Sequence, residues 1–377
     1  MNICLIASTP VPPQEGIGHY VWNLSRFLLR QGHTVQIITR GSWGRTQREE
    51  REGIIIWRPT FAPVYPWHVH LHSLFVNQLI SRSLSDVDVF HAHSPLPPVI
   101  KTRRPILLTV HTPMRADARS IPLRNVQALL VRLQAPVSYR VEQQLLKGAT
   151  RVAAVARSVA SELAEYGLKP ETVAVLGNGV DTTMFSPAEV EQTAAPYVLA
   201  AGRLGLRKGF EDLIECARIV TEQISDVRFL IAGSGPLEQS LRTQIEKAGL
   251  SGRVELLGHI ADRQRMAALY RGAAVFVHPA HYEGLPTVLL EAMACGRPVV
   301  ATAVSGALDV VEPEENGLLT PPKDPAALAG TVARLLADPA LGQRLGRAAR
   351  QTIEARYSWE KVGGRYLQIY RQLLGAG

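Results

Sequence analysis

Short apolar runs alternate with amphipathic stretches along nearly the whole chain. In the first half, the runs predict strands at residues 3–7, 34–39, 88–91, 106–110, 151–155 and 173–176. Helical spacing predicts helices at 20–30 and 126–146, and Pro136 favours a break or kink in the second. The second half repeats the scheme, with strands at 197–201, 227–232, 254–257, 275–278 and 299–302 and helices at 210–222, 236–248, 262–271 and 286–295. A last long amphipathic helix is predicted over 354–374.

Continuous apolar strands that are separated by helices indicate a parallel sheet with both faces covered. A length of 377 residues corresponds to about two domains. A segment with glycine, asparagine and proline separates the halves at 177–196. We therefore expect an α/β protein with two doubly wound domains, 1–180 and 181–354. The C-terminal helix, from about 355 to 377, is expected to pack back on the first domain.

Composition narrows the class of protein. The hydrophobic fraction of 46% and the charged fraction of 20% are typical of a soluble protein with sizeable cores. No apolar stretch approaches the ~20 residues that span a membrane, and the first residues lack the pattern of a signal peptide. The three scattered cysteines, Cys4, Cys216 and Cys295, are interpreted as buried thiols in a reducing cytoplasm. No Cys/His cluster has zinc spacing.

Positive charge is concentrated in the first half. Residues 1–150 hold 17 Lys/Arg and 8 Asp/Glu, whereas the remainder holds 24 and 25. The excess indicates an anionic partner, such as a phosphorylated acceptor, anionic lipid or nucleic acid, or simply a solvated basic face. Segment 114–151 interleaves leucine and valine with basic residues, and the stretch 61–67 adds aromatic side chains. The basic segment either lies on anionic lipid or packs on the first domain with its arginines solvated.

The segment from Glu283 to Glu291 carries the strongest chemical signal. It follows the strand ending at His278 and opens a helix, with Pro286 at the favoured first position. Amides at a helix N-terminus bind phosphate, while carboxylates accept hydrogen bonds from ligand hydroxyls. Phosphate at the helix end with hydroxyls on either side describes a nucleotide sugar. The alternative is a solvent-facing helix start whose acidic residues are favoured by the dipole.

A basic glycine loop from Gly202 to Gly209 follows the first strand of the second domain. It lies where doubly wound sheets bind ligands, at the carboxyl end of a strand. Arg203 and Lys208 in this loop would neutralise a diphosphate leaving group. A solvated basic loop fits the same pattern equally well.

Weaker signals come from two glycine pairs and a set of histidines. Gly16 and Gly18 follow the first strand, and residues 233–235 form a second pair, but tight-turn packing explains either. Histidines recur at strand ends, at positions 91, 93 and 111. His111 would point into an interdomain cleft, and a structural role is equally open.

Nearly the whole chain resembles glycosyltransferase family 4, which has the GT-B fold. The matching segments are EGIGHYVWNL, HAHS, LTVHTP, LGNGVDTTMF, AGRLGLRKGF, IAGSGP, LLGHI, EGLPTVLLEAMACGRPVVAT and ENGLLTPP. The match is densest over 201–321. Its most specific part is the combination of the Glu-x7-Glu element with the Arg203 and Lys208 pair.

The resemblance implies a retaining hexosyltransferase whose two Rossmann-like domains face a central cleft. Arg203 and Lys208 would bind the donor diphosphate, Glu283 the hydroxyls of the transferred sugar, and Glu291 the ribose. His111 would line the reaction centre. The remaining donor-site positions implied by the resemblance are Gly16, which closes over the phosphate and sugar, Ile260 beside the base, Leu285, and the amides near Thr287 and Val288.

The resemblance also implies the partners. It indicates a UDP- or GDP-sugar donor, a lipid-linked or soluble acceptor, no nucleic acid, no cofactor and no metal in the donor site. The expected location is the cytoplasm, with or without peripheral contact with the inner face of the cell membrane. Competing interpretations are a sugar-nucleotide epimerase, a phosphorylase, or a non-catalytic sugar-nucleotide-binding subunit. The intact set of four charged donor residues favours transfer.

Two positions depart from the family pattern. Glu15-Gly16 stands where the family often has Gly-Gly, and Glu15 would narrow the acceptor side or repel anionic acceptors. Pro286 has no amide hydrogen, so any sugar contact made by an amide there is missing.

Overall fold

The computed structural model describes residues 1–11, 13, 16–64, 67–120, 126–188 and 195–375. The chain forms two compact units. The first unit consists of Met1–Gly179 and Trp359–Gly377, and the second is Val180–Ser358. Each unit holds a largely parallel sheet with helices on it, so the predicted α/β class with two doubly wound sheets is confirmed.

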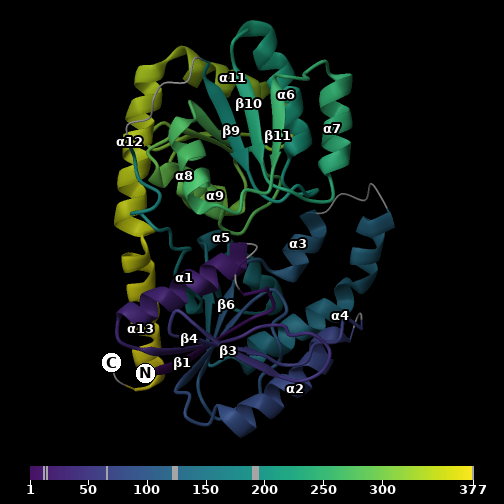
Figure 1. Ribbon diagram of the computed structural model, residues 1–377, viewed down its shortest axis with the longest axis vertical. Helices are drawn as coiled ribbons and strands as arrows, with labels where there is room; N and C mark the ends of the chain where they lie inside the picture. The colour runs from purple at the N-terminus through teal and green to yellow at the C-terminus, as the bar shows by residue number, and fades with distance from the viewer. Residues whose placement is uncertain (12, 14–15, 65–66, 121–125, 189–194, 376–377) are drawn as a thin grey trace. The chain divides into compact units, whose positions relative to one another are not determined.

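The first unit is built on an eight-stranded sheet with the order β3-β4-β2-β1-β5-β6-β7-β8, in which only β3 runs antiparallel to its neighbour (Figure 1). Its strands are β1 Asn2–Ala7, β2 Thr34–Ile38, β3 Gln47–Arg51, β4 Ile54–Arg58, β5 Val89–His93, β6 Ile106–Val110, β7 Arg151–Ala154 and β8 Ala174–Val175. Its helices are α1 Gly16–Arg30, α2 His68–Ser83, α3 Met114–Ser120, α4 Val126–Gly148, α5 Arg157–Glu162 and α13 Trp359–Leu373, with 3-10 turns η1 Leu163–Tyr166 and η2 Pro170–Thr172.

Helices α1 and α13 cover one face of this sheet because both present apolar side chains to it. Tyr20, Leu24 and Phe27 of α1 share a buried cluster with α13 and the central strands. The two helices cross closely at Gly363, where a Cβ atom would lie 2.3 Å from the Phe27 ring. Any larger residue at 363 would therefore push the helices apart.

The second unit has a six-stranded parallel sheet with the order β11-β10-β9-β12-β13-β14. Its strands are β9 Tyr197–Ala201, β10 Arg228–Ala232, β11 Val254–Gly258, β12 Val275–His278, β13 Val299–Thr302 and β14 Leu318–Thr320. Its helices are α6 Phe210–Gln223, α7 Glu238–Lys247, α8 Arg263–Gly272, α9 Thr287–Ala294, α10 Ser305–Leu308, α11 Pro325–Ala337 and α12 Pro339–Arg356.

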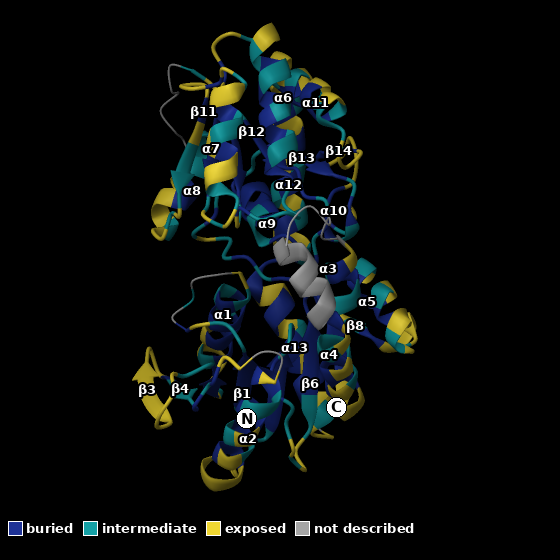
Figure 2. Ribbon diagram, turned by 90° about the vertical axis from the view of Figure 1, so that its right-hand side faces the viewer, coloured by how far each residue is buried: buried dark blue, intermediate teal, exposed yellow. Residues whose placement is uncertain are grey.

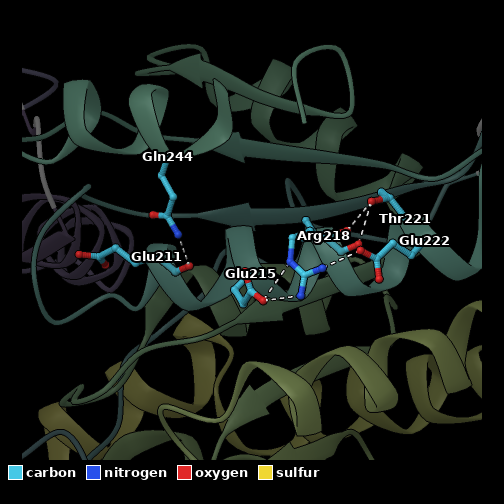
Figure 3. A network of polar contacts seen from close by, with 7 residues as sticks. Glu211, Glu215, Arg218, Thr221, Glu222 and Gln244 are labelled. Carbon is cyan, nitrogen blue, oxygen red and sulfur yellow. Dashed lines mark hydrogen bonds and ion pairs between the residues drawn. The ribbon is translucent and has the colours of Figure 1, made fainter. Parts of the chain in front are cut away.

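Burial follows the layering in both units. Central parallel strands such as β1, β12 and β13 are dark blue in Figure 2, whereas β3 is exposed along its whole length. The outer face of α6 is polar, and Arg218 there pairs with Glu215 and Glu222 one turn to either side (Figure 3). Gln244 of α7 donates to the carbonyl of Glu211 at 3.0 Å, which ties α7 to the first turn of α6.

The predicted last helix over 354–374 is wrong in one respect. The structure has two helices, because α12 ends at Arg356 and α13 begins at Trp359. The carbonyl of Tyr357 accepts a hydrogen bond from the amide of Val180 at 2.8 Å, instead of bonding within a continuing helix. The chain therefore leaves helical geometry at residues 357–358.

Three further expectations differ in detail. Pro136 lies inside the continuous helix α4 and does not divide it. Strand β5 extends to His93, so His91 lies within a strand and not at its end. Pro286 caps α9 with an extended ψ of 109°, and the first helical residue is Thr287.

The sequence pattern also missed α2 and the β3–β4 hairpin. Helix α2 is rich in histidine, which weakens its apolar stripe, and β3 consists only of polar residues. All three cysteines are buried thiols, as predicted. Within the part of the chain that the structure describes, no helix is long and apolar enough to cross a membrane. In the same ranges, no group of three or more His, Cys, Asp or Glu side chains is arranged to hold a metal ion.

Candidate active site

The order of strands in the second unit marks a place for a ligand. The chain runs outward from β9 through β10 to β11, then returns to β12 on the other side of β9 and continues through β13 to β14. The direction of winding therefore reverses between β9 and β12, which pair at Val275–Val198 and Phe276–Leu199. Open α/β sheets bind ligands outside the carboxyl ends of the strands at such a point. The loops 202–209 and 279–286 flank it.

These two loops are locked to each other by the backbone. The amide of His281 donates to the carbonyl of Arg207 at 2.7 Å. Gly209 has a φ of +65°, and a Cβ atom there would lie 1.9 Å from the carbonyl oxygen of Pro279. Only glycine satisfies both the backbone conformation and this close approach. The His281 ring is further held by Asp212 of α6, with Nε2 2.7 Å from Oδ2.

Lys208 and Glu283 are brought together across the two loops. The ammonium of Lys208 forms an ion pair with the carboxylate of Glu283, and their side chains are 21% and 19% exposed. His278, at the end of β12, has Nε2 3.8 Å from Glu283 Oε2 and makes no hydrogen bond there to a described residue. Lys208, which was predicted to bind the diphosphate, and Glu283, which was predicted to bind the sugar, are therefore direct partners in the structure.

Electrostatics keep Glu283 ionised. Burial alone would raise the pKa of its carboxyl, but Lys208, His278 and Arg207 outweigh burial and lower the pKa to about 2. Burial lowers the pKa of His278 to about 4, although Glu283 acts in the opposite direction. The site thus presents an ammonium and a carboxylate that are already partly removed from water. Such a pair can exchange partners with a ligand that carries both anionic and hydroxyl groups.

Glu291 lies on α9 and is held by different residues. Its Oε1 accepts from the Arg263 guanidinium at 2.9 Å, and its Oε2 accepts from the Tyr270 hydroxyl at 2.9 Å. The side chain is only 9% exposed. Each carboxylate oxygen has a second lone pair, so Glu291 retains capacity for ligand hydroxyls while its position is fixed. Arg263 is itself stacked 4.7 Å from the centroid of the Phe185 ring.

The remaining second-unit residues lie around the same carboxyl edge. Thr287 and Val288 are the first two residues of α9, whose amides have no carbonyl partner in the preceding turn. Leu285 is buried in the loop before them. Arg203 is exposed and forms no ion pair with a described carboxylate. Ile260 follows β11, two strands away from β9, in a loop where Gly258 accepts from the amide of Gly233.

The first unit has its own reversal, between β1 and β5. Gly16 is the exposed first residue of α1, in the connection that follows β1, and Glu15 lies outside the described residues. The Ser8 hydroxyl donates to the carbonyl of Leu96 at 2.8 Å, which ties the connections after β1 and β5. The fold therefore places Gly16 and His111 in the first unit and the other predicted site residues in the second.

His111 follows β6 and is almost completely buried. Burial lowers the pKa of its imidazole to about 3. Its backbone amide donates to the Ser94 hydroxyl at 3.0 Å, and its Nε2 lies 3.3 Å from Nδ1 of His93. Tyr20 packs edge-on against its ring, with centroids 4.9 Å apart. The imidazole of His111 is therefore neutral and is contacted by the rings of His93 and Tyr20.

Sequence reasoning missed the residues that hold the predicted ones. Arg263 and Tyr270 are seven residues apart on α8, which places them on one face of the helix two turns apart, toward Glu291. That spacing was a usable signal. His278 and His281 lie just before the segment that begins at Glu283, and the pairing of His281 with Asp212 depends on strand order and was not readable from spacing.

Comparisons with known proteins agree with this arrangement. The model for "Glycosyltransferase Family 4" matches residues 15–184, and the model for "Glycosyl transferases group 1" matches residues 182–352. The chain is 29% identical to D-inositol 3-phosphate glycosyltransferase of Xylanimonas cellulosilytica, covering 95% of this chain and 91% of that protein. Sucrose-phosphate synthase from Thermosynechococcus elongatus superposes with a TM-score of 0.85 at 26% identity over 100% of both chains.

A protein from Anabaena solved with UDP and glucose superposes with a TM-score of 0.76 over 99% of this chain and 100% of that one. At 19% identity, this likeness concerns the fold alone. The two parallel-sheet units and the similarity to these structures identify the fold as GT-B.

Proposed function

This chain belongs to the family 4 glycosyltransferases, and on that premise we propose that it transfers a hexosyl group, with retention, from a nucleoside diphosphate sugar to an acceptor hydroxyl. The observation that supports this donor is the Lys208–Glu283 ion pair at the winding reversal of the second unit. A diphosphate would draw Lys208 and Arg203 to its oxygens. The sugar hydroxyls would then donate hydrogen bonds to the carboxylate of Glu283.

The chemistry follows from which charges develop during transfer. The bond between the anomeric carbon and the diphosphate breaks, and negative charge accumulates on the leaving oxygens. Lys208, Arg203 and the first amides of α9 supply positive charge and hydrogen bonds for that group. The amides of α9 are fixed by the fold and would stabilise the leaving charge without reorganisation, whereas Lys208 and Arg203 would first turn toward the diphosphate. Glu291 would hold the ribose, which donor and product share.

The nucleotide base and the acceptor are the open parts of the proposal. A UDP-sugar is the donor to test first, because solved structures of similar fold, from Anabaena and S. aureus, contain UDP. The donor site as proposed needs no metal ion, since Lys208 and Arg203 are its cations. A lipid-linked and a soluble acceptor both remain within the proposal.

The test is nucleoside diphosphate release from candidate donors, with and without acceptor lipids and glycans. Transfer predicts acceptor-dependent release and a product with the anomeric configuration of the donor, read by NMR coupling. Release without sugar transfer, or interconversion of nucleotide sugars, would replace transfer with epimerisation. Binding without any turnover would indicate a non-catalytic subunit. Thermal stabilisation by a panel of diphosphates identifies the base, since ligand at ~100 times its dissociation constant adds ~2.7 kcal/mol.

A peripheral contact with anionic lipid is the second part of the proposal. Trp43 and Trp67 of the first unit are 78% and 58% exposed, and such side chains favour the membrane interface. Arg115 and Arg119, which the basic segment contributes, bond to Glu165 in the same unit, so they support the proposal less than the tryptophans do. Replacing both tryptophans with Ser should abolish co-sedimentation with anionic vesicles at low salt. Equal sedimentation of the variant and wild type would remove lipid contact from the proposal.

A further inference from the structure

Three histidines of the first unit lie side by side, two on β5 and one directly after β6. The rings of His91 and His93 have centroids 4.0 Å apart, and those of His93 and His111 are 5.5 Å apart. His91 is fully bonded, with Nδ1 2.6 Å from the Tyr370 hydroxyl and Nε2 2.8 Å from the Thr109 hydroxyl. His93 differs, because its Nδ1 faces His111 and its Nε2 is buried without a hydrogen-bond partner among the described residues.

All three imidazoles are neutral at physiological pH. Burial lowers the pKa of each of them, and the neighbouring histidines lower those of His91 and His93 further. A neutral imidazole has one N–H donor and one bare nitrogen acceptor. The short contact between His93 Nδ1 and His111 Nε2 therefore contains one proton, which belongs to one of the two rings.

The unpartnered nitrogen decides which ring carries that proton. If His111 were the donor, His93 would carry its proton on Nε2, and a buried N–H would have no acceptor. Buried N–H groups without partners are rare in folded proteins, since the lost hydrogen bond to water is not replaced. If His93 is the donor, its Nε2 is a bare lone pair and no N–H is stranded. His93 therefore donates, and His111 accepts at Nε2.

We propose that His93 is a positioning residue that fixes His111 as the Nδ1–H tautomer. His111 then offers a hydrogen-bond donor at Nδ1, and it cannot accept a proton there while neutral. This inference rests on the proposed function only in assigning a ligand to His111. The ligand group would be an oxygen acceptor, such as a sugar hydroxyl or a phosphate oxygen, and not an acidic proton. The Tyr20 ring packs edge-on against the imidazole, and the bond from the His111 amide to Ser94 holds the backbone of this residue.

The test separates the tautomer from the activity. The tautomer is read on the full chain, labelled with ¹⁵N-histidine, from two-bond nitrogen–proton correlations, with His111→Gln to assign the signal. His93→Phe keeps an aromatic ring but removes the donor, and His93→Asn returns a donor near the position of Nδ1. His33→Phe changes a partly exposed histidine at the amino end of β2 and serves as the matched control.

We expect wild type and His93→Asn to show His111 with its proton on Nδ1, and His93→Phe to show a lower population of this tautomer, because the donor that selects it is gone. The value of kcat/KM should fall about tenfold in His93→Phe, which corresponds to the loss of one hydrogen bond in the site. It should return to within about threefold of wild type in His93→Asn. The control should leave both readouts unchanged.

A wild-type signal with the proton on Nε2 would overturn the positioning role, whatever the kinetics. A lower Nδ1–H population in His93→Phe with unchanged turnover would support the positioning role and remove His111 from the proposed function. If His93→Phe does not fold, the wild-type spectrum and His93→Asn still decide the tautomer.

Discussion

The two sheets have the same winding reversal but opposite chemistry at it. In the second unit, the loops after β9 and β12 meet through an ion pair between Lys208 and Glu283 and through a His281–Asp212 contact. In the first unit, the strands next to the reversal carry neutral imidazoles that bond to tyrosine and threonine hydroxyls, such as His91 to Tyr370. The edge in the second unit carries charged side chains that are partly buried. The edge in the first unit carries neutral donors and acceptors that are fully buried.

This difference shows how one topology serves two kinds of recognition. Charged pairs at partial burial can be exchanged for a charged ligand at modest cost, because the ligand replaces the partner. Neutral hydrogen bonds at full burial fix geometry and reject charge, since an unpaired charge there has no solvent. The comparison therefore predicts large effects from removing charge in the second unit and large effects from introducing charge in the first.

The largest effect is expected from Lys208→Ala. The variant loses the cation that would neutralise the leaving diphosphate, and removal of one such preorganised donor typically costs ~10²–10³-fold in turnover. Arg203→Ala should behave similarly, although its side chain is exposed. Steady-state kinetics with the donor identified by thermal shift measures both. Lys208→Arg keeps the charge and is the control, and turnover of Lys208→Ala within threefold of wild type would refute the role.

Variants of Glu283 and Glu291 should differ in which ligand they bind less tightly, the bare nucleoside diphosphate or the complete nucleotide sugar. Glu283→Gln frees Lys208 from its ion pair, so a bare nucleoside diphosphate should bind at least as tightly as to wild type. The complete nucleotide sugar should bind about tenfold more weakly, through the lost charged hydrogen bond. Glu291→Gln should weaken both ligands by a similar factor, because they share the ribose. Titration calorimetry with each ligand measures these changes.

Tyr270→Phe is the control for this pair of variants. It removes the hydroxyl that holds Glu291 Oε2 but keeps the carboxylate, so it should weaken both ligands less than Glu291→Gln does. Loss of bare diphosphate binding in Glu283→Gln, with Glu291→Gln unaffected, would reverse the two assignments.

The buried carboxyl of Glu142 in the first unit should make the stability of the protein depend on pH. Glu142 accepts from the Tyr166 hydroxyl and the Met114 amide, and burial raises its pKa to about 7 despite those bonds. The folded protein therefore holds this proton between pH 4.5 and about 7, where the unfolded chain has lost it. The free energy of unfolding should fall as pH rises through that window.

Glu142→Gln should remove this dependence. The amide keeps an acceptor for both donors without the charge, so the variant should exceed wild type by about 2–3 kcal/mol near pH 8 and match it near pH 4.5. Urea unfolding at both pH values measures the difference. A wild-type free energy of unfolding that rises across this window, with the variant flat, would contradict the assignment.

The smallest effect is expected at Arg218. Its ion pairs with Glu215 and Glu222 are solvent-exposed, and such pairs contribute little because water screens them (Figure 3). Arg218→Ala should leave both the melting temperature and the turnover unchanged within measurement error. It is the charge-removal control for Lys208→Ala in the same unit. A marked loss of turnover would mean that long-range charge, and not the local ion pair, controls the site.

The strand pattern predicted most of the fold because buried parallel strands are written as continuous apolar runs. β6, β9, β12 and β13 begin and end at the predicted residues. The hairpin of β3 with β4 was missed because β3 has no apolar residue to mark it, and its pairing depends on a partner strand. The division of the final helix at Tyr357 was missed because its cause, the amide of Val180, is 177 residues away in the sequence.

The sequence predicted the residues that would contact a ligand, but it did not predict the residues that hold them in place. Lys208 and Glu283 stand in recognisable segments, yet their mutual ion pair requires β9 and β12 to be neighbours, which sequence order hides. The burial of His111 and its contact with His93 depend likewise on the register of β5 with β6. Residue identity predicts which chemistry is available, and strand order decides which residues share it.

The first unit is built from both ends of the chain, and this bears on the order in which the protein is made. Its core needs Trp359, Tyr366 and Tyr370, which are synthesised after the whole of the second unit. The second unit is a continuous stretch, Val180–Ser358, whose core residues are all synthesised before residue 359. During translation, the first sheet therefore waits with one face uncovered while the inserted unit folds. A nascent chain stalled before residue 359 exposes that face to chaperones and proteases, so quality control would act first on the amino-terminal half.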